Sequence, residues 1–200
     1  MQLVQDFLER TAAATPDATA LLCGERRLGY GELDTRANRL AHALRARGIG
    51  RGDRVVLWNG NDVETVVAIF AVLKAGAVFV LAGETSKPPQ VDYLVRDCGA
   101  AALLLRARDV GHARGLLAPA GPLRLVAVVG GAATPTDDPS VVGFDALVAS
   151  GSASRPDRVG IDRDLACLIY TSGSSGQPKG VMSAHHQVVF APGSILQYLG

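Results

Sequence analysis

Short apolar runs alternate with amphipathic segments along much of the chain. The runs have the length of β-strands and cover residues 55–58, 77–81, 101–105 and 125–129. Residues 63–73 and 88–97, between these runs, carry apolar side chains at helical spacing. The run at 125–129 lacks apolar–polar alternation, which is typical of a strand buried on both faces of a parallel sheet. Strands that alternate with helices predict an α/β fold with largely parallel sheets flanked by helices.

The N-terminal part begins with a different pattern. Leu3, Phe7 and Leu8 share one helical face, so we predict a short helix over residues 2–14. Two short strands are predicted at 18–23 and 27–30, followed by a helix that Gly48 ends. Either Asn61 or Asp62 is expected to cap the helix at 63–73.

The pattern of the remaining chain predicts shorter elements. They are a helix at 109–117, a loop at 132–139, a helical piece at 144–149, a connector at 151–164, strands at 165–170 and 181–184, and the start of a helix at 188–199. We therefore predict a first αβ subdomain over 1–150, the connector, and a further unit that starts at 165–200.

The composition excludes several classes of protein. Hydrophobic residues make up 48% of the 200 residues, enough for a sizeable core, while the net charge is +1 and aromatic residues are 5%. These values do not favour binding to nucleic acid, which needs basic or aromatic surfaces. Glu64 and Lys74 interrupt the most apolar region, so no membrane span of ~20 residues is expected. The sequence favours a cytoplasmic protein, because the first residues lack the pattern of a signal peptide.

The cysteines and histidines suggest no metal site. Cys23, Cys98 and Cys167 are widely separated and are expected to be small buried hydrophobic residues in a reducing compartment. His185 and His186 are adjacent, and on a strand they would point to opposite faces, so a packing role is expected. No paired carboxylates or zinc-ligand spacing are recognisable.

The chemistry of the chain is concentrated between Tyr170 and Gly180, in the run Tyr-Thr-Ser-Gly-Ser-Ser-Gly-Gln-Pro-Lys-Gly. Glycines let a backbone approach an anion closely, and successive backbone N–H groups can surround it. Hydroxyl groups add hydrogen-bond donors, and a lysine adds positive charge. The pattern predicts a loop that binds a phosphate chain through Thr171, Ser172, Gly173, Ser174, Ser175, Gly176 and Lys179.

Two other interpretations of this loop fit less well. A Gly/Ser linker seldom follows a buried strand directly or ends in Pro-Lys-Gly-Val. A Walker A loop counted from Gly173 would need glycine at 178 and Ser or Thr at 180. The chain has Pro178 and Gly180 at those positions, so this is a different phosphate loop.

The run resembles the signature of the adenylate-forming superfamily, which includes acyl-CoA synthetases, acyl-AMP ligases and adenylation domains of nonribosomal peptide synthetases. Four upstream segments resemble the family in the right order: 28–41, 52–56, 73–80 and 93–100. The chain departs from the family after Val80, where a proline is usual. The family's later motifs, including the catalytic lysine, have no counterpart, so the chain resembles a partial N-terminal AMP-binding domain that lacks catalytic residues.

The resemblance implies a reaction and its participants. Family members use ATP, with Mg²⁺, to convert a carboxylic acid into an acyl-adenylate, and a thiol of coenzyme A or of the phosphopantetheine arm of a carrier protein then accepts the acyl group. The loop between Tyr170 and Gly180 would bind the β- and γ-phosphates. The segment 59–64, together with Leu73-Lys-Ala-Gly, leads us to favour an acyl-CoA synthetase or acyl-AMP ligase over an amino-acid adenylation domain.

A second class of function remains open at this point. A chain that carries the phosphate loop without the later motifs could be a non-catalytic remnant or a weak nucleotide-binding module, so enzyme activity of these 200 residues alone is left undecided. We expect the isolated chain to be poorly stable and inactive, because a sheet that is cut short leaves unpaired strand edges and exposed apolar surface.

Overall fold

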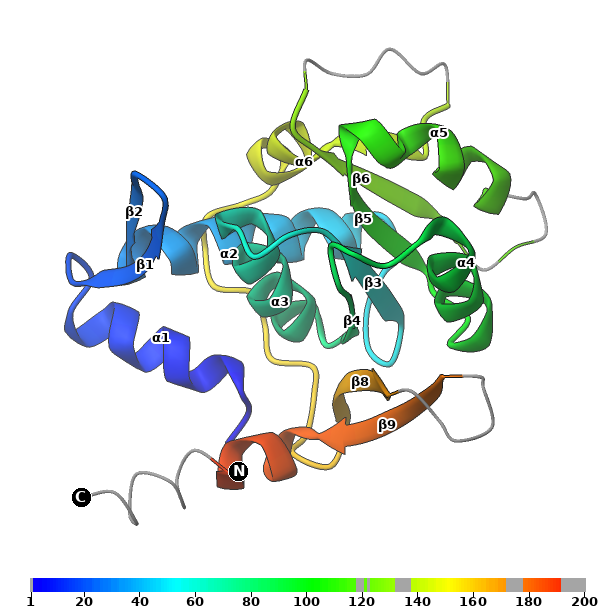
Figure 1. The fold of residues 1–200 in the computed structure, drawn as a ribbon. Helices are drawn as coiled ribbons and strands as arrows, with labels where there is room; N and C mark the ends of the chain where they lie inside the picture. The colour runs from blue at the N-terminus through cyan, green and yellow to red at the C-terminus, as the bar shows by residue number, and fades with distance from the viewer. Residues whose placement is uncertain (1, 118–120, 122, 132–137, 172–177, 192–200) are drawn as a thin grey trace.

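The computed structural model describes residues 2–117, 121, 123–131, 138–171 and 178–191 (Figure 1). Its centre is a seven-stranded sheet in the order β7-β6-β5-β3-β4-β8-β9. The strands are β3 (Arg54–Trp58), β4 (Val78–Ala82), β5 (Ala102–Arg106), β6 (Leu125–Val129), β7 (Val141–Gly143), β8 (Leu165–Thr171) and β9 (Lys179–Ala184). Neighbouring strands are parallel, except for β8 and β9, which are antiparallel. The predicted α/β class with a largely parallel sheet is therefore confirmed.

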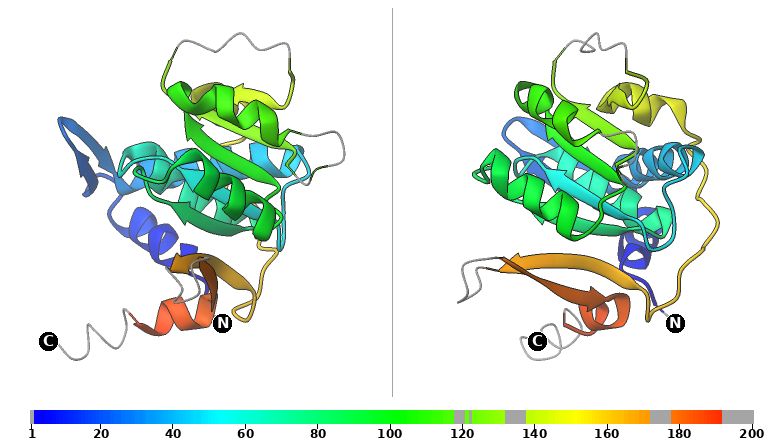
Figure 2. Two further views of the ribbon diagram at one scale, coloured as in Figure 1. Left: turned by 45° about the vertical axis from the view of Figure 1, so that its right-hand side comes forward. Right: turned by 90° about the vertical axis from the view of Figure 1, so that its right-hand side faces the viewer.

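Helices cover both faces of this sheet (Figure 2). The helices are α1 (Gln5–Ala14), α2 (Tyr30–Ala46), α3 (Val63–Ala75), α4 (Pro88–Asp97), α5 (Val110–Ala113) and α6 (Phe144–Ser150). Alternate side chains of each central strand point to opposite faces, so Val55 and Leu57 join the core beneath α2, α3 and α6. Val56 and Trp58 join the second core, beneath α4 and α5. Burial on both sides explains the continuous apolar runs of the sequence.

A two-stranded antiparallel hairpin lies outside the main sheet. It consists of β1 (Thr19–Cys23) and β2 (Arg26–Gly29), and it packs beside α2. The predicted second strand extended to Tyr30, but Tyr30 is the first residue of α2. This part of the chain otherwise follows the predicted order of helix, hairpin and helix.

Helix α3 shows how local sequence sets its ends. Asp62, one of the two predicted alternatives, is the N-cap of the helix. The carboxylate of Asp62 accepts a hydrogen bond from the backbone N–H of Thr65 at 3.0 Å. Gly76 ends the helix at φ +83°, a left-handed conformation that glycine adopts without steric cost. The helix therefore delivers the chain directly into β4.

The structure corrects three predictions of secondary structure. The helix expected at 109–117 is α-helical only over Val110–Ala113, between two 3₁₀ turns at Ala107–Asp109 and Arg114–Leu116. Gly111 and Gly115 lower helix propensity there, which accounts for the irregular segment. Strand β7 was missed because it has only three residues, and residues 185–191 are helical, three residues before the predicted start.

The connector and the β8–β9 hairpin complete the chain. Residues 151–164 contain neither helix nor strand, as predicted, and they lead to β8, which lies between β4 and the edge strand β9. β8 pairs with β4 over Phe79–Cys167 and Val80–Leu168, so the first strand of the predicted further unit extends the first sheet. The division of the chain into residues 1–150, the connector 151–164 and residues 165–200 remains our proposal.

Candidate functional site

The β8–β9 hairpin carries the predicted phosphate loop. Thr171, the last residue of β8, lies opposite Lys179, the first residue of β9, and both are exposed. Ser172, Gly173, Ser174, Ser175 and Gly176 lie outside the described residues. The structure thus brings together the two predicted site residues that it describes, one on each side of the loop.

The burial pattern of β8 explains how this loop reaches the surface. Ala166, Cys167 and Leu168 are buried, whereas Ile169 and Thr171 are exposed. The first half of the strand is therefore anchored in the core, and the second half extends toward solvent. A phosphate chain could approach the exposed end without displacing core side chains.

Lys179 keeps its charge available at this end. Within the described part of the chain, its ammonium group has no ion-pair or hydrogen-bond partner. A cation that is not already neutralised can attract a phosphate group, whereas a paired one would first have to give up its partner. The position of Lys179 therefore suits anion binding.

Two tyrosines lie against the flanks of the loop. The hydroxyl group of Tyr170 on β8 donates a hydrogen bond to Asp97 of α4 at 2.5 Å. The hydroxyl group of Tyr93, also on α4, donates to the backbone carbonyl of Pro178 at 3.1 Å. Burial and the hydrogen bond to Asp97 raise the pKa of Tyr170, and burial and the charge of Asp97 raise the pKa of Tyr93. Both hydroxyl groups therefore remain protonated donors at neutral pH.

Sequence reasoning missed this set of contacts. Tyr93 and Asp97 lie within the segment 93–100 that resembles the family, but no functional role could be given to that segment. They are 85 and 73 positions away from their partners Pro178 and Tyr170. No local pattern in the sequence indicates such a contact.

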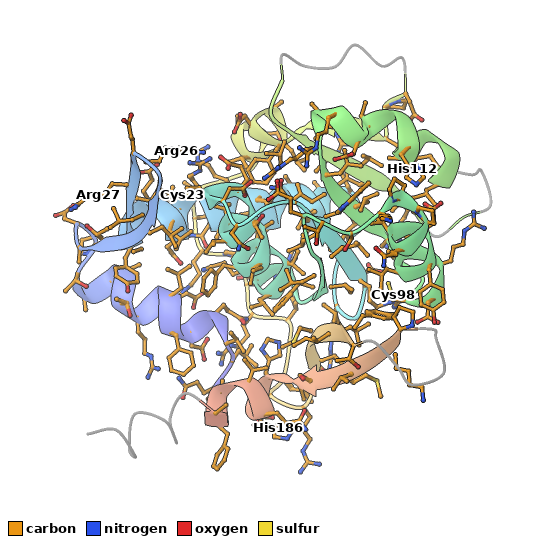
Figure 3. The ribbon with its side chains drawn as sticks, viewed as in Figure 1. Cys23, Arg26, Arg27, Cys98, His112 and His186 are labelled. Atoms are coloured by element: carbon orange, nitrogen blue, oxygen red, sulfur yellow. The ribbon has the colours of Figure 1, made fainter. Side chains whose placement is uncertain are left out.

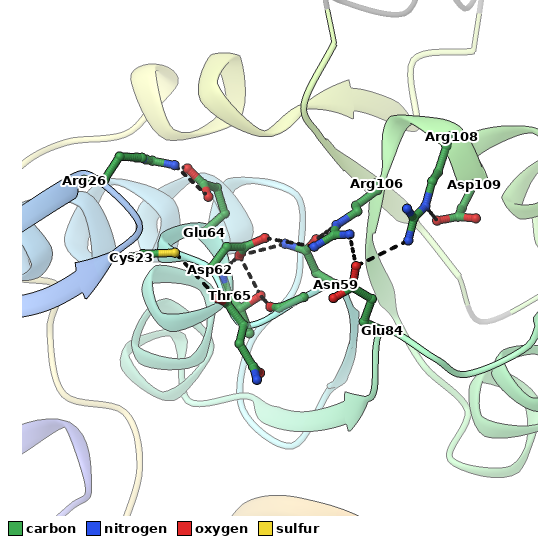
Figure 4. Close-up of polar contacts among 12 residues, drawn as sticks. Cys23, Arg26, Asn59, Asp62, Glu64, Thr65, Glu84, Arg106, Arg108 and Asp109 are labelled. Carbon is green, nitrogen blue, oxygen red and sulfur yellow. Dashed lines mark hydrogen bonds and ion pairs between the residues drawn. The ribbon is translucent and has the colours of Figure 1, made fainter.

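A second polar cluster lies where β3, β4 and β5 end (Figure 4). Arg106 donates to the side-chain oxygen of Asn59 at 3.0 Å and also pairs with Glu84. Asn59 in turn donates to Asp62 at 3.0 Å. A Cβ atom at Gly60 would lie 2.0 Å from the guanidinium of Arg106, so glycine leaves room for the guanidinium at this position.

The cluster borders a cavity of about 340 Å³ between the β1–β2 hairpin and the start of α3. Ligands of α/β sheets often bind at the carboxyl ends of parallel strands, and this cavity lies at such a place. However, Arg106 is paired with Glu84 and Asp62, and Arg108 with Glu84 and Asp109. We therefore interpret the cluster as a connection between the three strand ends.

The histidines and cysteines do not form a reactive centre (Figure 3). His185 is buried, and its Nδ1 atom accepts a hydrogen bond from the backbone N–H of Val4 at 3.2 Å, which agrees with the predicted packing role. His185 and His186 begin a helix, so the strand geometry considered for them was wrong. Cys98 and Cys167 are buried as predicted, but Cys23 is only partly buried.

The described ranges contain neither a metal site nor a helix that could span a membrane. No group of three His, Cys, Asp or Glu side chains there is arranged to hold a metal ion. None of the helices described is both long and apolar enough to cross a membrane.

Comparisons with known proteins place these features in context. The sequence profile named AMP-binding enzyme matches residues 8–197. Tyrocidine synthase 3 of Brevibacillus parabrevis is 35% identical over 93% of this chain, which corresponds to 3% of that protein. A medium/long-chain-fatty-acid–CoA/3-oxocholest-4-en-26-oate–CoA ligase of Mycobacterium marinum is 30% identical over 92% of this chain and 34% of its own length.

The fold has a counterpart among solved structures. The anthranilate CoA ligase AuaEII, in a crystal structure with anthranoyl-AMP, superposes with a TM-score of 0.82 at 26% identity. The match covers 92% of this chain and 35% of that chain. The 200 residues thus span about a third of the length of the CoA ligases they match.

Proposed function

Because the chain belongs to the AMP-binding enzyme family, we propose that its β8–β9 hairpin binds the β- and γ-phosphates of ATP while a carboxylic acid is activated as an acyl-adenylate. The observation that carries the proposal is the pairing of Thr171 with Lys179 at the base of the loop. The exposed Thr171 and the ammonium group of Lys179, which has no partner among the described residues, are thereby held at the two ends of a Gly/Ser-rich segment.

The proposed reaction has a clear electrostatic requirement. A carboxylate oxygen forms a bond to the α-phosphorus of ATP, and the bond from that phosphorus to the oxygen of the β-phosphate breaks. The leaving pyrophosphate gains negative charge, which fixed donors stabilise. We assign this task to Lys179, to the hydroxyl groups of Thr171, Ser172, Ser174 and Ser175, and to the backbone at Gly173 and Gly176.

Further participants belong to the whole protein. Mg²⁺ bound to the phosphates would supply additional positive charge. The described residues offer no cluster of three metal ligands, so we assign no protein ligand to the ion. The relatives include a CoA ligase and a tyrocidine synthase, so either coenzyme A or a carrier protein's phosphopantetheine arm fits as the proposed thiol acceptor.

The proposal is tested by ATP–pyrophosphate exchange in the natural protein that carries this chain, with a panel of carboxylic acids. Replacing both Thr171 and Lys179 by alanine should lower acid-dependent exchange at least 100-fold, because each lost donor typically costs about 3–4 kcal/mol in the transition state. Lys87→Ala, at an exposed lysine before α4, is the matched control. Wild-type exchange by the double variant would refute the assignment of the loop.

A further inference from the structure

Helix α4 presents two polar side chains to the hairpin. Tyr93 and Asp97 are four residues apart, so they lie on the same face of the helix. Tyr93 contacts Pro178, which follows the loop, and Asp97 contacts Tyr170, which precedes it. One helix therefore holds one residue on each side of residues 171–177.

The two contacts support each other through the aromatic rings. The rings of Tyr93 and Tyr170 meet edge to face, with centroids 6.4 Å apart and an interplanar angle of 86°. Gly180 lies opposite Tyr170 in the β8–β9 register. A Cβ atom at Gly180 would lie 3.1 Å from the Tyr170 ring, closer than most carbon contacts, so glycine leaves room for this ring.

Helix α4 is itself firmly anchored. Its residues Val91, Leu94 and Val95 are buried in the second core. Just beyond its last residue, the backbone carbonyls of Cys98 and Gly99 accept hydrogen bonds from the guanidinium of Arg54 at 2.5 and 2.9 Å. The helix can thus serve as a fixed support for the more exposed hairpin.

We propose that Tyr93 and Asp97 are positioning residues for ATP, because they fasten both flanks of the phosphate loop to the core through Pro178 and Tyr170. The inference rests on the function proposed above. Neither residue touches the phosphates in this proposal. They hold Thr171 and Lys179 at a fixed separation, so that these two residues do not have to be repositioned when ATP binds.

The test compares substrates as well as variants in the natural protein. Tyr93→Phe removes one neutral hydrogen bond and should raise KM for ATP about fivefold, whereas Tyr170→Phe removes a hydrogen bond to a carboxylate and should raise it about tenfold or more. KM for the acid should stay unchanged in both. Tyr30→Phe is the matched control, because the hydroxyl group of Tyr30 on α2 has no hydrogen bond within the described part of the chain.

The effect of Asp97 should depend on Tyr170. Asp97→Ala alone should match Tyr170→Phe, and the double variant should be no worse than either single one, because all three lack the same hydrogen bond. Asp97→Asn retains an acceptor oxygen and should recover part of the affinity for ATP. A purely structural role would instead lower the amount of active protein and affect both substrates equally, which would overturn the inference.

Amide hydrogen exchange separates this inference from the proposed function. Tyr93→Phe and Tyr170→Phe should speed exchange at Thr171, Lys179 and Gly180, while residues 165–168 stay protected. If the wild-type protein shows no acid-dependent exchange of pyrophosphate, the proposed function fails. Faster amide exchange in the two variants would still show that Tyr93 and Tyr170 hold the hairpin against α4. Unchanged amide exchange at Lys179 and an unchanged KM for ATP would each refute the positioning role.

Discussion

The ammonium nitrogen of Lys74 lies 2.6 Å from a carboxylate oxygen of Glu9 and 2.9 Å from one of Asp34. The Lys74 side chain is only 1% exposed. One buried cation near the end of α3 thus joins α1 and α2. Glu9 also pairs with Arg155 of the connector, so four segments of the chain meet at this point.

Removing this cation should destabilise the fold strongly. Lys74→Met leaves the two carboxylates without their shared partner and should lower the free energy of unfolding by about 3–5 kcal/mol. Urea denaturation measures the change. Lys87→Met, at an exposed lysine, should have almost no effect. A triple variant that also carries Glu9→Gln and Asp34→Asn should recover part of the lost free energy of unfolding. If the triple variant is as unstable as Lys74→Met alone, this explanation is wrong.

Stability should depend on the charge of His185. Burial lowers the pKa of His185, against the opposing effect of Asp164 and Asp6. The folded state therefore favours the neutral ring. The stability that the neutral ring contributes is fully present above the ordinary histidine pKa of about 6.5, and it is lost as the pH falls below that value. Protonation would also remove the acceptor for the backbone N–H of Val4.

The variant His185→Asn should isolate this effect, because its side-chain oxygen can accept the same hydrogen bond without titrating. Urea denaturation at pH 7 and pH 5 should show a smaller loss of stability for the variant than for the wild type. Equal losses in the two proteins would show that His185 does not contribute to the pH dependence.

The three cysteines should differ in reactivity. Burial raises the pKa of Cys98 to about 11, and burial also raises the pKa of Cys167. The reactive thiolate is therefore scarce at both positions near pH 8.5. Iodoacetamide should modify the partly exposed Cys23 first, as mass spectrometry of the peptides would show, and all three should react in urea. Rapid modification of Cys98 in the folded protein would contradict its burial.

Asp62 should matter as a helix cap. Asp62→Ala removes the acceptor for the backbone N–H of Thr65 and should cost about 1–2 kcal/mol of stability, measured by urea denaturation. Asp62→Asn keeps an acceptor oxygen and should cost much less. Similar losses for the two variants would assign the effect to the charge of Asp62, which also lies 3.8 Å from Arg106.

Much of the fold could be predicted because its signals are local. The apolar runs at 55–58 and 125–129 gave their strands nearly to the residue, since burial on both faces excludes polar side chains. The helix cap, predicted at Asn61 or Asp62, depends on neighbouring residues alone. Thr171 and Lys179 were predicted in the loop between two strands, whereas the structure places them at the end of β8 and the start of β9. The helix predicted at 109–117 was wrong over most of its length, because two glycines lower the helix propensity of that segment.

The sequence by itself determined the α/β class and the ends of most elements, because periodicity, caps and glycines act over a few residues. Only the tertiary structure decided the strand order and which distant side chains meet: Tyr93 with Pro178, Tyr170 with Asp97, and Lys74 with Glu9. These pairings follow from how the helices pack on the two faces of the sheet, and packing depends on the shape of all the elements together.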